Sequence, residues 1–282
     1  MKVAALQMVS TPRVDENLAQ ARTLIAQAAQ DGAELVALPE YFCLMGLHDK
    51  DKLHIAEPLA DATHPNPATA PMQAMLAQAA REHGVWLIGG TLPILSHEPE
   101  RVFNTVLVFN PQGQRVARYD KIHLFCFDDG QRRYDEAASL TPGTQPASFH
   151  MQDKQGESWH IGLSVCYDLR FPELFRQLGA EQALDLIVLP AAFTDTTGKA
   201  HWELLLRARA VENLCHVLAP AQGGLHENGR RTFGHALVIE PWGQVLAMQT
   251  TEGPGVVLAD LSKDHQTTLR TQLPALSHRV FA

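Results

Sequence analysis

Apolar residues gather into short runs typical of strands, separated by stretches in which they recur every three or four residues. Several runs are apolar without alternation, as in strands covered on both faces. The expected strands are Val3–Met8, Leu35–Pro39, Val85–Leu92, Asn104–Asn110, His160–Cys166, Leu184–Pro190, His216–Pro220 and Gly234–Ile239. Helical spacing predicts amphipathic helices over 15–31, 70–83 and 201–214. Strands that alternate with helices predict an α/β fold.

Two features of the pattern refine this architecture. No helix separates the strands over 85–92 and 104–110, so we expect a mixed sheet. The pentapeptide Leu-Val-Ala-Leu-Pro at 35–39 resembles Leu-Ile-Val-Leu-Pro at 186–190. Two similar βαβ halves would give two packed sheets with helices outside. The alternative is that the two pentapeptides are similar only because both are buried strands.

Composition and charge narrow the class. Hydrophobic residues make up 45% and charged residues 19%, which is typical of a soluble globular protein. The 282 residues fit two ordinary domains or one large α/β domain. A net charge of −8 argues against nucleic acid or a membrane surface as the main partner. The four cysteines form no metal or disulfide motif, and no segment reads as a signal peptide or membrane span, so we expect a cytoplasmic location.

Three residues follow predicted buried segments and could carry chemistry. Cys166 precedes an expected helix start, whose N–H groups can lower a thiol pKa and bind an oxyanion; the alternative is a small buried hydrophobe. Glu40 lies at the carboxyl edge of the sheet as a candidate general base, or as a solvated loop residue. Lys121, which Asp120 could pair, is a candidate electrophile or a surface charge.

Other catalytic motifs fail on spacing. Residues 162–166 begin like a Gly-x-Ser-x-Gly serine elbow but place Cys166 where the second glycine is required. The chain has no Gly-Lys-Ser/Thr phosphate loop and no Gly-x-Gly-x-x-Gly. Its 14 histidines include no His-Glu-x-x-His pair, so we expect no metal site.

Three sequence blocks together resemble the nitrilase superfamily of carbon–nitrogen hydrolases. They are Leu-Pro-Glu40, Tyr-Asp-Lys121-Ile-His-Leu and Ser-Val-Cys166-Tyr-Asp-Leu-Arg-Phe-Pro-Glu-Leu, in the family's order. The resemblance implies a catalytic triad of Glu40, Lys121 and Cys166, with Glu136 as a supporting second glutamate. It also implies one domain over residues 1–282, folded as a four-layer α-β-β-α sandwich with mixed sheets, that forms a homodimer or higher homo-oligomer.

A finer resemblance concerns the substrate. Residues 192–212, with 221–226 and 230–236, are similar to the branch that hydrolyses deaminated glutathione to 2-oxoglutarate and cysteinylglycine. The alternatives are an ω-amidase acting on 2-oxoglutaramate or another short carboxylate-bearing amide, and a non-catalytic binding protein with the same fold. Segment 125–134 departs from the family pattern, with Cys126 and a basic Gln-Arg-Arg, and therefore bears on substrate preference.

The implied mechanism follows from the residue types. Glu40 takes the proton of Cys166, and the thiolate attacks the carbonyl of a small-molecule amide. Lys121 and a backbone N–H near Tyr167 hold the oxyanion. Amine leaves, and water activated by Glu40 releases the acid from a thioester. No cofactor is needed.

Two residues are expected to bind the substrate. Arg170 follows the nucleophile by one helical turn and could bind a substrate carboxylate bidentately, or could instead pair with Glu173. Thr194 follows the strand over 184–190 and could donate a hydrogen bond to the same carboxylate end.

Overall fold

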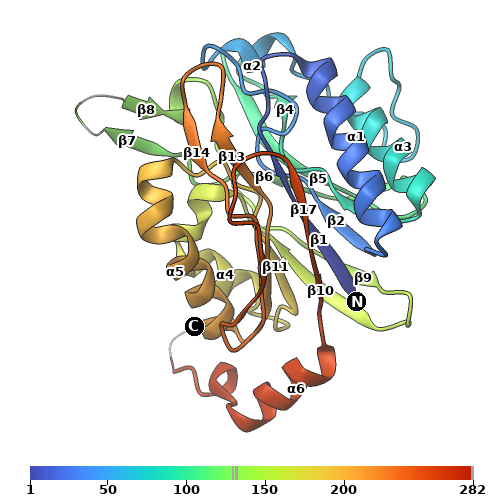
Figure 1. Cartoon of the computed structure of the whole chain (residues 1–282), viewed down its shortest axis with the longest axis vertical. Helices are drawn as coiled ribbons and strands as arrows, with labels where there is room; N and C mark the ends of the chain where they lie inside the picture. The colour runs from blue at the N-terminus through green and yellow to red at the C-terminus, as the bar shows by residue number, and fades with distance from the viewer. Residues whose placement is uncertain (129, 131–132, 281–282) are drawn as a thin grey trace.

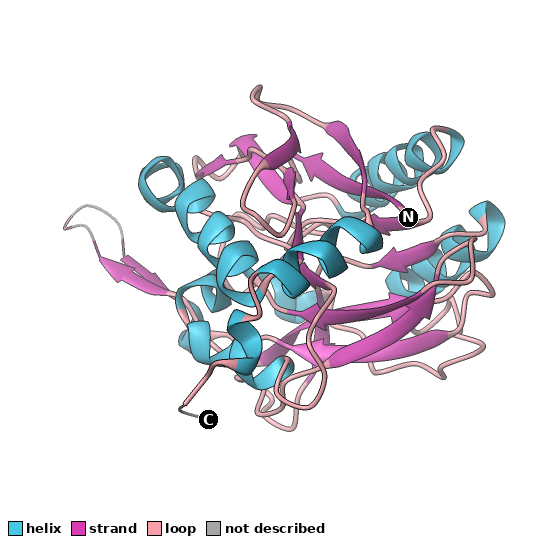
Figure 2. Ribbon diagram, turned by 90° about the horizontal axis from the view of Figure 1, so that it is seen from below, coloured by secondary structure: helices cyan, strands magenta, loops and turns pink. Residues whose placement is uncertain are grey.

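The side chains of strand β1 (Lys2–Met8) alternate between two hydrophobic cores in the computed structural model, which describes residues 1–128, 130 and 133–280. Val3 and Ala5 face a core shared with the second sheet, whereas Leu6 and Met8 pack toward the first pair of helices. Because a strand presents successive side chains to opposite faces, β1 separates these two layers. The expected α/β sandwich is confirmed, with strands in the middle and helices on both sides (Figure 2).

Nine of the described strands form the first sheet, with β1 near its centre. The main order is β14-β13-β1-β2-β3-β5-β4, while β17 pairs with β1 and β6 pairs with β5. The bounds are β2 Leu35–Ala37, β3 Trp86–Ile88, β4 Leu92–Leu95, β5 Val102–Phe109, β6 Arg115–Asp120, β13 Ala221–Leu225, β14 Arg231–Phe233 and β17 Gly255–Asp260. Strand β1 is therefore joined to the C-terminal part of the chain, antiparallel to β17 from Lys2 opposite Asp260 to Gln7 opposite Gly255.

The second sheet contains six described strands in the order β16-β15-β12-β11-β10-β9. Their bounds are β9 Ser148–Gln152, β10 Ser158–Leu163, β11 Leu186–Val188, β12 His216–Ala219, β15 Leu237–Ile239 and β16 Val245–Met248. Each sheet contains a trio of neighbouring parallel strands, β1-β2-β3 in one and β10-β11-β12 in the other, and in the first sheet β13 also runs parallel to β1. The similar pentapeptides fall on the middle strand of each trio, as the two-halves interpretation predicts.

Helices cover the outer faces of both sheets (Figure 1). Helices α1 (Val14–Gln30) and α3 (Pro71–His83) pack on the first sheet, and α5 (Asp195–Asn213) packs on the second beside α4 (Pro172–Leu178). The smaller elements are α2 (Asp51–His54), α6 (Lys263–Gln272) and the 3₁₀ turns η1 (Glu136–Ala138), η2 (Cys166–Arg170) and η3 (Ala275–Ser277). The predicted helices over 15–31 and 70–83 are confirmed. The third begins at Asp195 rather than 201, because Thr194 caps it by accepting a hydrogen bond from the N–H of Thr197.

One expected strand and one expected helix need correction. The run over 85–92 is not one strand, because it breaks into β3 and β4 at a glycine pair. Gly90 has φ +54°, and a Cβ there would lie 2.2 Å from the carbonyl oxygen of Pro39. This close approach excludes a larger residue and fixes the chain just before Glu40. The chain after Cys166 begins as the 3₁₀ turn η2, and the α-helix starts only at Pro172.

Candidate active site

Glu40 lies just beyond β2, where the two sheets meet. Its side chain is 1% exposed. Oε1 accepts hydrogen bonds from Lys121 Nζ at 2.9 Å and from Asn104 Nδ2 at 3.0 Å, and Oε2 accepts one from the backbone N–H of Ala192 at 2.9 Å. Asn104 belongs to β5 of the first sheet, whereas Ala192 follows β11 of the second. The carboxylate is therefore held from both sheets, and the alternative of a solvated loop residue is wrong.

Lys121 follows β6 and is equally buried. Its Nζ donates to Glu40 and to both oxygens of Glu136, at 2.7 and 3.0 Å. Burial by itself lowers the pKa of Lys121, but the carboxylates of Glu136 and Glu40 outweigh it, so the pKa is raised overall and the group stays an ammonium. The expected partner Asp120 instead accepts from Thr105 and Arg118. The surface alternative for Lys121 is therefore wrong as well.

Cys166 starts η2 at the end of the second sheet, with its N–H donating to the carbonyl of Pro190 at 2.9 Å. Its backbone adopts φ +47°, a left-handed conformation that costs a non-glycine residue about 1–3 kcal/mol. Burial and the charges of Glu40 and Glu136 raise the pKa of the thiol well above its usual value, despite the opposing charge of Lys121. The expectation that the elbow lowers this pKa is wrong in the free site, since burial outweighs the nearby N–H groups. A neutral thiol needs a base to become a nucleophile.

Asp168 holds the backbone turn that carries Cys166. Its buried carboxylate accepts from the N–H of Val165 at 2.8 Å and the hydroxyl of Tyr119 at 2.7 Å. It also contacts His123 twice, accepting from the N–H at 3.1 Å and lying 2.7 Å from Nδ1. Four neighbouring groups therefore converge on one carboxylate, and together they fix the strained conformation at the nucleophile.

Glu136 stands on η1, facing Lys121 from the side opposite Glu40. Besides Lys121, it accepts from the hydroxyl of Tyr41 at 2.9 Å and from the N–H of Phe125 at 2.8 Å. Burial tends to raise the pKa of Glu136, but Lys121 and these donors lower it overall. The structure thus brings Glu136 to the candidate triad, where the sequence had placed it only by resemblance.

The remaining predicted residues line a narrow pocket over Cys166. Arg170 lies half-buried over the rings of Phe193 and Tyr167, 5.4 and 5.8 Å from their centroids, and near His201 Nδ1 at 3.4 Å. It forms no ion pair with Glu173, so that alternative is wrong. Tyr167 also packs edge-on against Phe125. Thr194 lines the same pocket, but its hydroxyl is engaged in capping α5.

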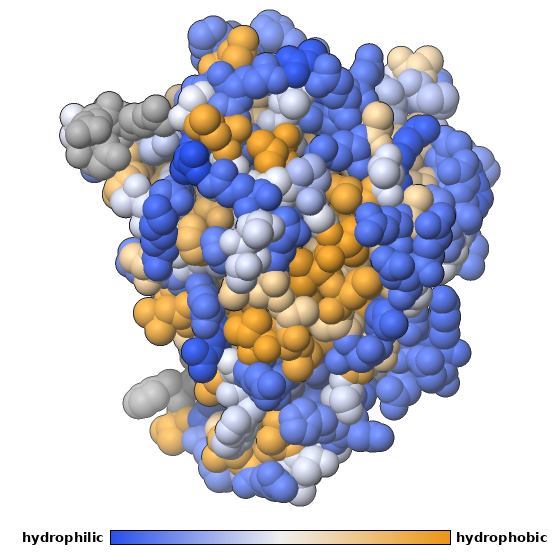
Figure 3. Space-filling view, viewed as in Figure 1, coloured by the Kyte–Doolittle hydropathy of each residue, from blue (hydrophilic) through white to orange (hydrophobic). Residues whose placement is uncertain are grey.

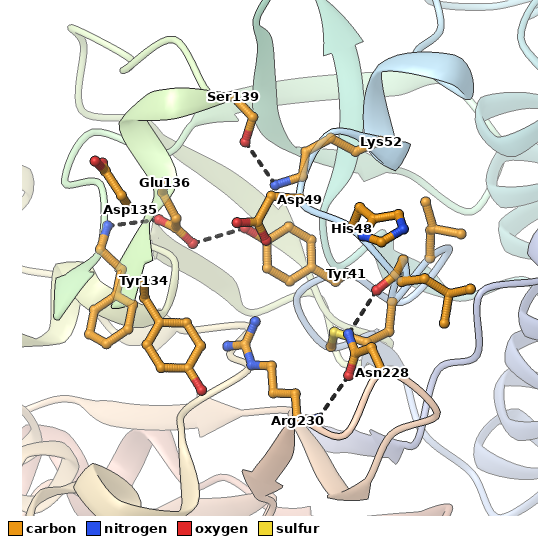
Figure 4. A pocket seen from close by; sticks show the side chains of 15 residues that line it. Tyr41, His48, Asp49, Lys52, Tyr134, Asp135, Glu136, Ser139, Asn228 and Arg230 are labelled. Atoms are coloured by element: carbon orange, nitrogen blue, oxygen red, sulfur yellow. Dashed lines mark hydrogen bonds between the residues drawn. The ribbon is translucent and has the colours of Figure 1, made fainter. Parts of the chain in front are cut away.

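A larger cleft opens next to this pocket and shares Phe125, Glu136 and Arg230 with it. Its volume is about 380 Å³, and its further walls include Tyr41, His48, Lys52, Tyr134 and Asn228 (Figure 4). We call the two parts the Cys166 lobe and the large lobe. Phe125 and Tyr134 belong to segment 125–134, so this segment does border the site. Residues 129, 131 and 132 of it lie outside the described residues.

The described residues show no group of three or more His, Cys, Asp and Glu side chains that could hold a metal ion. Within the same part of the chain, no helix is long and apolar enough to cross a membrane. Sequence reasoning missed Asn104, Asp168, Lys52 and Arg230. Asn104 had one signal, since it is a polar residue inside an otherwise apolar strand.

Comparison with known proteins supports the resemblance found in the sequence. The family model described as carbon-nitrogen hydrolase matches residues 2–270. A deaminated glutathione amidase of Synechocystis sp. is 42% identical over 99% of this chain and 97% of its own length. The deaminated glutathione amidase of Homo sapiens is 38% identical over 98% of this chain and 81% of its own length.

Solved structures agree with the fold. The Caenorhabditis elegans NitFhit protein superposes with a TM-score of 0.86 and 34% identity, over 99% of this chain and 65% of that chain. Saccharomyces cerevisiae Nit3, a member of the nitrilase superfamily, gives a TM-score of 0.84 with 29% identity, over 100% of this chain and 97% of its own. An amidase from Nesterenkonia sp., solved with acrylamide added to its active-site cysteine, gives 0.75 with 27% identity, over 97% of this chain and 98% of its own.

Proposed function

The chain belongs to the carbon–nitrogen hydrolase family, and from that premise we propose that it is a thiol amidase with Cys166 as nucleophile. The observation that carries this proposal is the pairing of Lys121 with Glu40 and Glu136, together with the action of all three charges on the buried thiol of Cys166 at a strained turn. A non-catalytic binding protein would have no need for a strained cysteine beside a buried carboxylate.

The chemistry starts with proton transfer. Because the pKa of the Cys166 thiol is raised, Glu40 must remove its proton as the thiolate attacks the amide carbonyl. Protonated Glu40 returns this proton to the amine nitrogen as the C–N bond breaks, so the amine leaves and the acyl group becomes a thioester on Cys166. Water, deprotonated by Glu40, then adds to the thioester and releases the acid.

Lys121 is the proposed electrophile, together with a backbone N–H near Tyr167. Each oxyanion donor contributes about 3 kcal/mol in comparable sites. All three protons of the Lys121 ammonium point at glutamate oxygens in the free site. One of the bonds to Glu136 must therefore lengthen when the oxyanion forms, which gives Glu136 a role in positioning Lys121.

We propose deaminated glutathione as the substrate, cleaved to 2-oxoglutarate and cysteinylglycine. The curated relatives that carry this name, at 42% and 38% identity, support the assignment. The keto-acid end would lie in the Cys166 lobe, with Arg170 on its carboxylate and Thr194 beside it. The helix cap uses the Thr194 oxygen as an acceptor, so its hydroxyl proton can be donated to the substrate when Thr197 is the donor of the Thr194–Thr197 hydroxyl pair.

The deciding experiment compares kcat/KM for deaminated glutathione with kcat/KM for 2-oxoglutaramate. A higher value for the first supports the proposal, and a higher value for the second assigns the chain to ω-amidase activity. Mass spectrometry of the acylated protein should find a thioester on Cys166. Absence of both turnover and thioester would leave the binding-protein alternative.

We further propose one domain over residues 1–282 that works in the cytoplasm as a homodimer or higher homo-oligomer. Exposed apolar side chains support self-association: Leu204 and Val211 on α5 are 67% and 45% exposed, and Trp242 in the β15–β16 turn is 56% exposed. Apolar residues also gather in a band over β17 (Figure 3). Light scattering of the purified protein tests this, and a monomer at micromolar concentration would contradict it.

A further inference from the structure

Arg230 projects into the large lobe without a balancing charge. Its Nη2 donates to the carbonyl of Ala192 at 2.6 Å, while its Nε is buried and has no partner. The guanidinium lies 5.6 Å from the ring centroid of Tyr134 and points into the space that Figure 4 shows between Tyr134, Tyr41 and Asn228. A buried donor without an acceptor is unfavourable, so this group is suited to an anionic ligand.

Lys52 approaches the same space from the opposite wall. Its Nζ donates to Ser139 Oγ at 3.2 Å and lies 5.4 Å from the ring centroid of Tyr41. Burial lowers the pKa of Lys52, and the nearby charge of Glu136 offsets only part of this effect. A bound carboxylate would favour the charged ammonium form of Lys52. Lys52 is thus a second cation of the lobe.

The charges around the two lobes do not cancel locally. Lys121 is shared by two glutamates, which leaves the centre of the site with a net negative charge. Asp49 is exposed in the wall of the large lobe, and its charge raises the pKa of Lys52 without an ion pair between the two among the described residues. A substrate anion that enters the large lobe would therefore meet Arg230 and Lys52 as its counter-charges.

The position of Arg230 indicates which part of a substrate it meets. Arg230 and Glu136 line both lobes, whereas Cys166 lines only the smaller one. An amide whose carbonyl lies at Cys166, with its acyl end toward Arg170, must direct its amine across this junction. We propose that the large lobe holds the leaving amine, and that Arg230 with Lys52 binds a carboxylate carried by that amine.

This inference rests on the proposed function and states which feature of the substrate's amine half the protein recognises. The preferred substrate carries one carboxylate on each side of the scissile bond, as an amide between a keto acid and a peptide-like amine does. A primary amide that releases ammonia would leave the large lobe, of about 380 Å³, without a ligand and Arg230 without a counter-charge.

The test uses two substrates that differ only at the far end of the amine: deaminated glutathione and its C-terminal carboxamide. We expect the wild-type protein to prefer the free acid by about 10- to 100-fold in kcat/KM. In Arg230→Met and in Lys52→Met this preference should fall several-fold, because each variant keeps one of the two cations. The matched control is Arg231→Met, because Arg231 is exposed and pairs with Glu252; there the preference should stay.

The ratio of kcat/KM for the two substrates, measured in the same variant, separates a change in specificity from a general loss of activity. Equal wild-type rates for the two substrates would overturn the inference while leaving the proposed amidase intact. A preference that survives in both Arg230→Met and Lys52→Met would do the same. Where Arg230→Met fails to fold, an unchanged preference in Lys52→Met overturns it. If neither substrate is hydrolysed and no thioester forms on Cys166, the proposed function fails and this inference with it.

Discussion

Replacing Asp168 by asparagine should weaken the contacts that hold the backbone turn on which Cys166 lies. The carboxylate accepts from Val165 N–H, Tyr119 hydroxyl and His123 N–H, and it also contacts the ring nitrogen of His123. Tyr119 and Val165 share Oδ2, and both His123 contacts are to Oδ1. An asparagine offers one carbonyl oxygen and one NH₂, so whichever way it faces, one backbone N–H, that of Val165 or that of His123, meets the NH₂.

The magnitude follows from the hydrogen bond lost. A hydrogen bond to a charged group contributes about 1.5–3 kcal/mol, so the loss is at least about 1.5–3 kcal/mol of the roughly 5–15 kcal/mol that stabilise a folded protein. The left-handed backbone at Cys166 holds about 1–3 kcal/mol of strain, which the turn can release by moving the thiol once its support weakens. We therefore expect both the free energy of unfolding and kcat to fall.

The assay is urea unfolding followed by circular dichroism at one fixed protein concentration, together with kcat for a keto-acid amide. Tyr119→Phe is the control, since it removes one donor and keeps the ring; its loss should be about 1–2 kcal/mol with most activity retained. An Asp168→Asn protein with wild-type midpoint and wild-type kcat would show that the four contacts do not hold the turn.

Three further predictions concern the triad and the response to pH. Cys166→Ala should abolish turnover and keep the fold. The control is Cys215→Ala, at a buried site outside both lobes, which should stay active. Near-normal turnover of the Cys166→Ala protein would exclude a covalent route through this thiol. The glutamine of Glu40→Gln cannot accept a proton, and Lys121→Arg misplaces the positive charge. In both variants we expect the amplitude of the acylation burst to fall sharply. A normal burst in either variant would remove that residue from the mechanism. Burial lowers the pKa of His226 to about 4, against 6.5 unfolded, so the unfolded chain binds more protons in this window and stability falls as pH drops from 6.5 toward 4. Between about pH 7.5 and 5 this histidine should account for about 2 kcal/mol, and His226→Gln should flatten the slope of unfolding free energy against pH; an unchanged slope would contradict it.

The sequence predicted the fold well where side-chain periodicity is strong. Strand β1 and helices α1 and α3 appear within a residue or two of the expected bounds. Strands β6 and β17 were missed for different reasons. The charged residues of β6 interrupt the apolar run expected of a buried strand, since Arg115 and Arg118 lie on a half-exposed face. Strand β17 is short and half-buried, and its order comes from pairing with β1 rather than from its own sequence.

The site could be predicted only where its residues lie in contiguous sequence motifs. Glu40, Lys121 and Cys166 each lie in a recognisable block, and the structure brings them together. Lys52 carries no local signal, and the block that begins at Arg230 indicates a branch of the family but not the position of this side chain in the cleft. The left-handed backbone at Cys166 could not be predicted either, since it depends on Asp168 meeting side chains from the other sheet.

The pairing of β1 with β17 has a consequence for biosynthesis. Strand β1 finds its antiparallel neighbour in residues 255–260 and its parallel neighbour β13 in 221–225, both far later in the chain. Until these emerge from the ribosome, one long edge of β1 offers unpaired N–H and C=O groups, and such edges promote association between chains. We therefore expect the nascent chain to be prone to aggregation until residues 255–260 have been made, and truncation before residue 255 should yield insoluble product rather than a smaller stable enzyme.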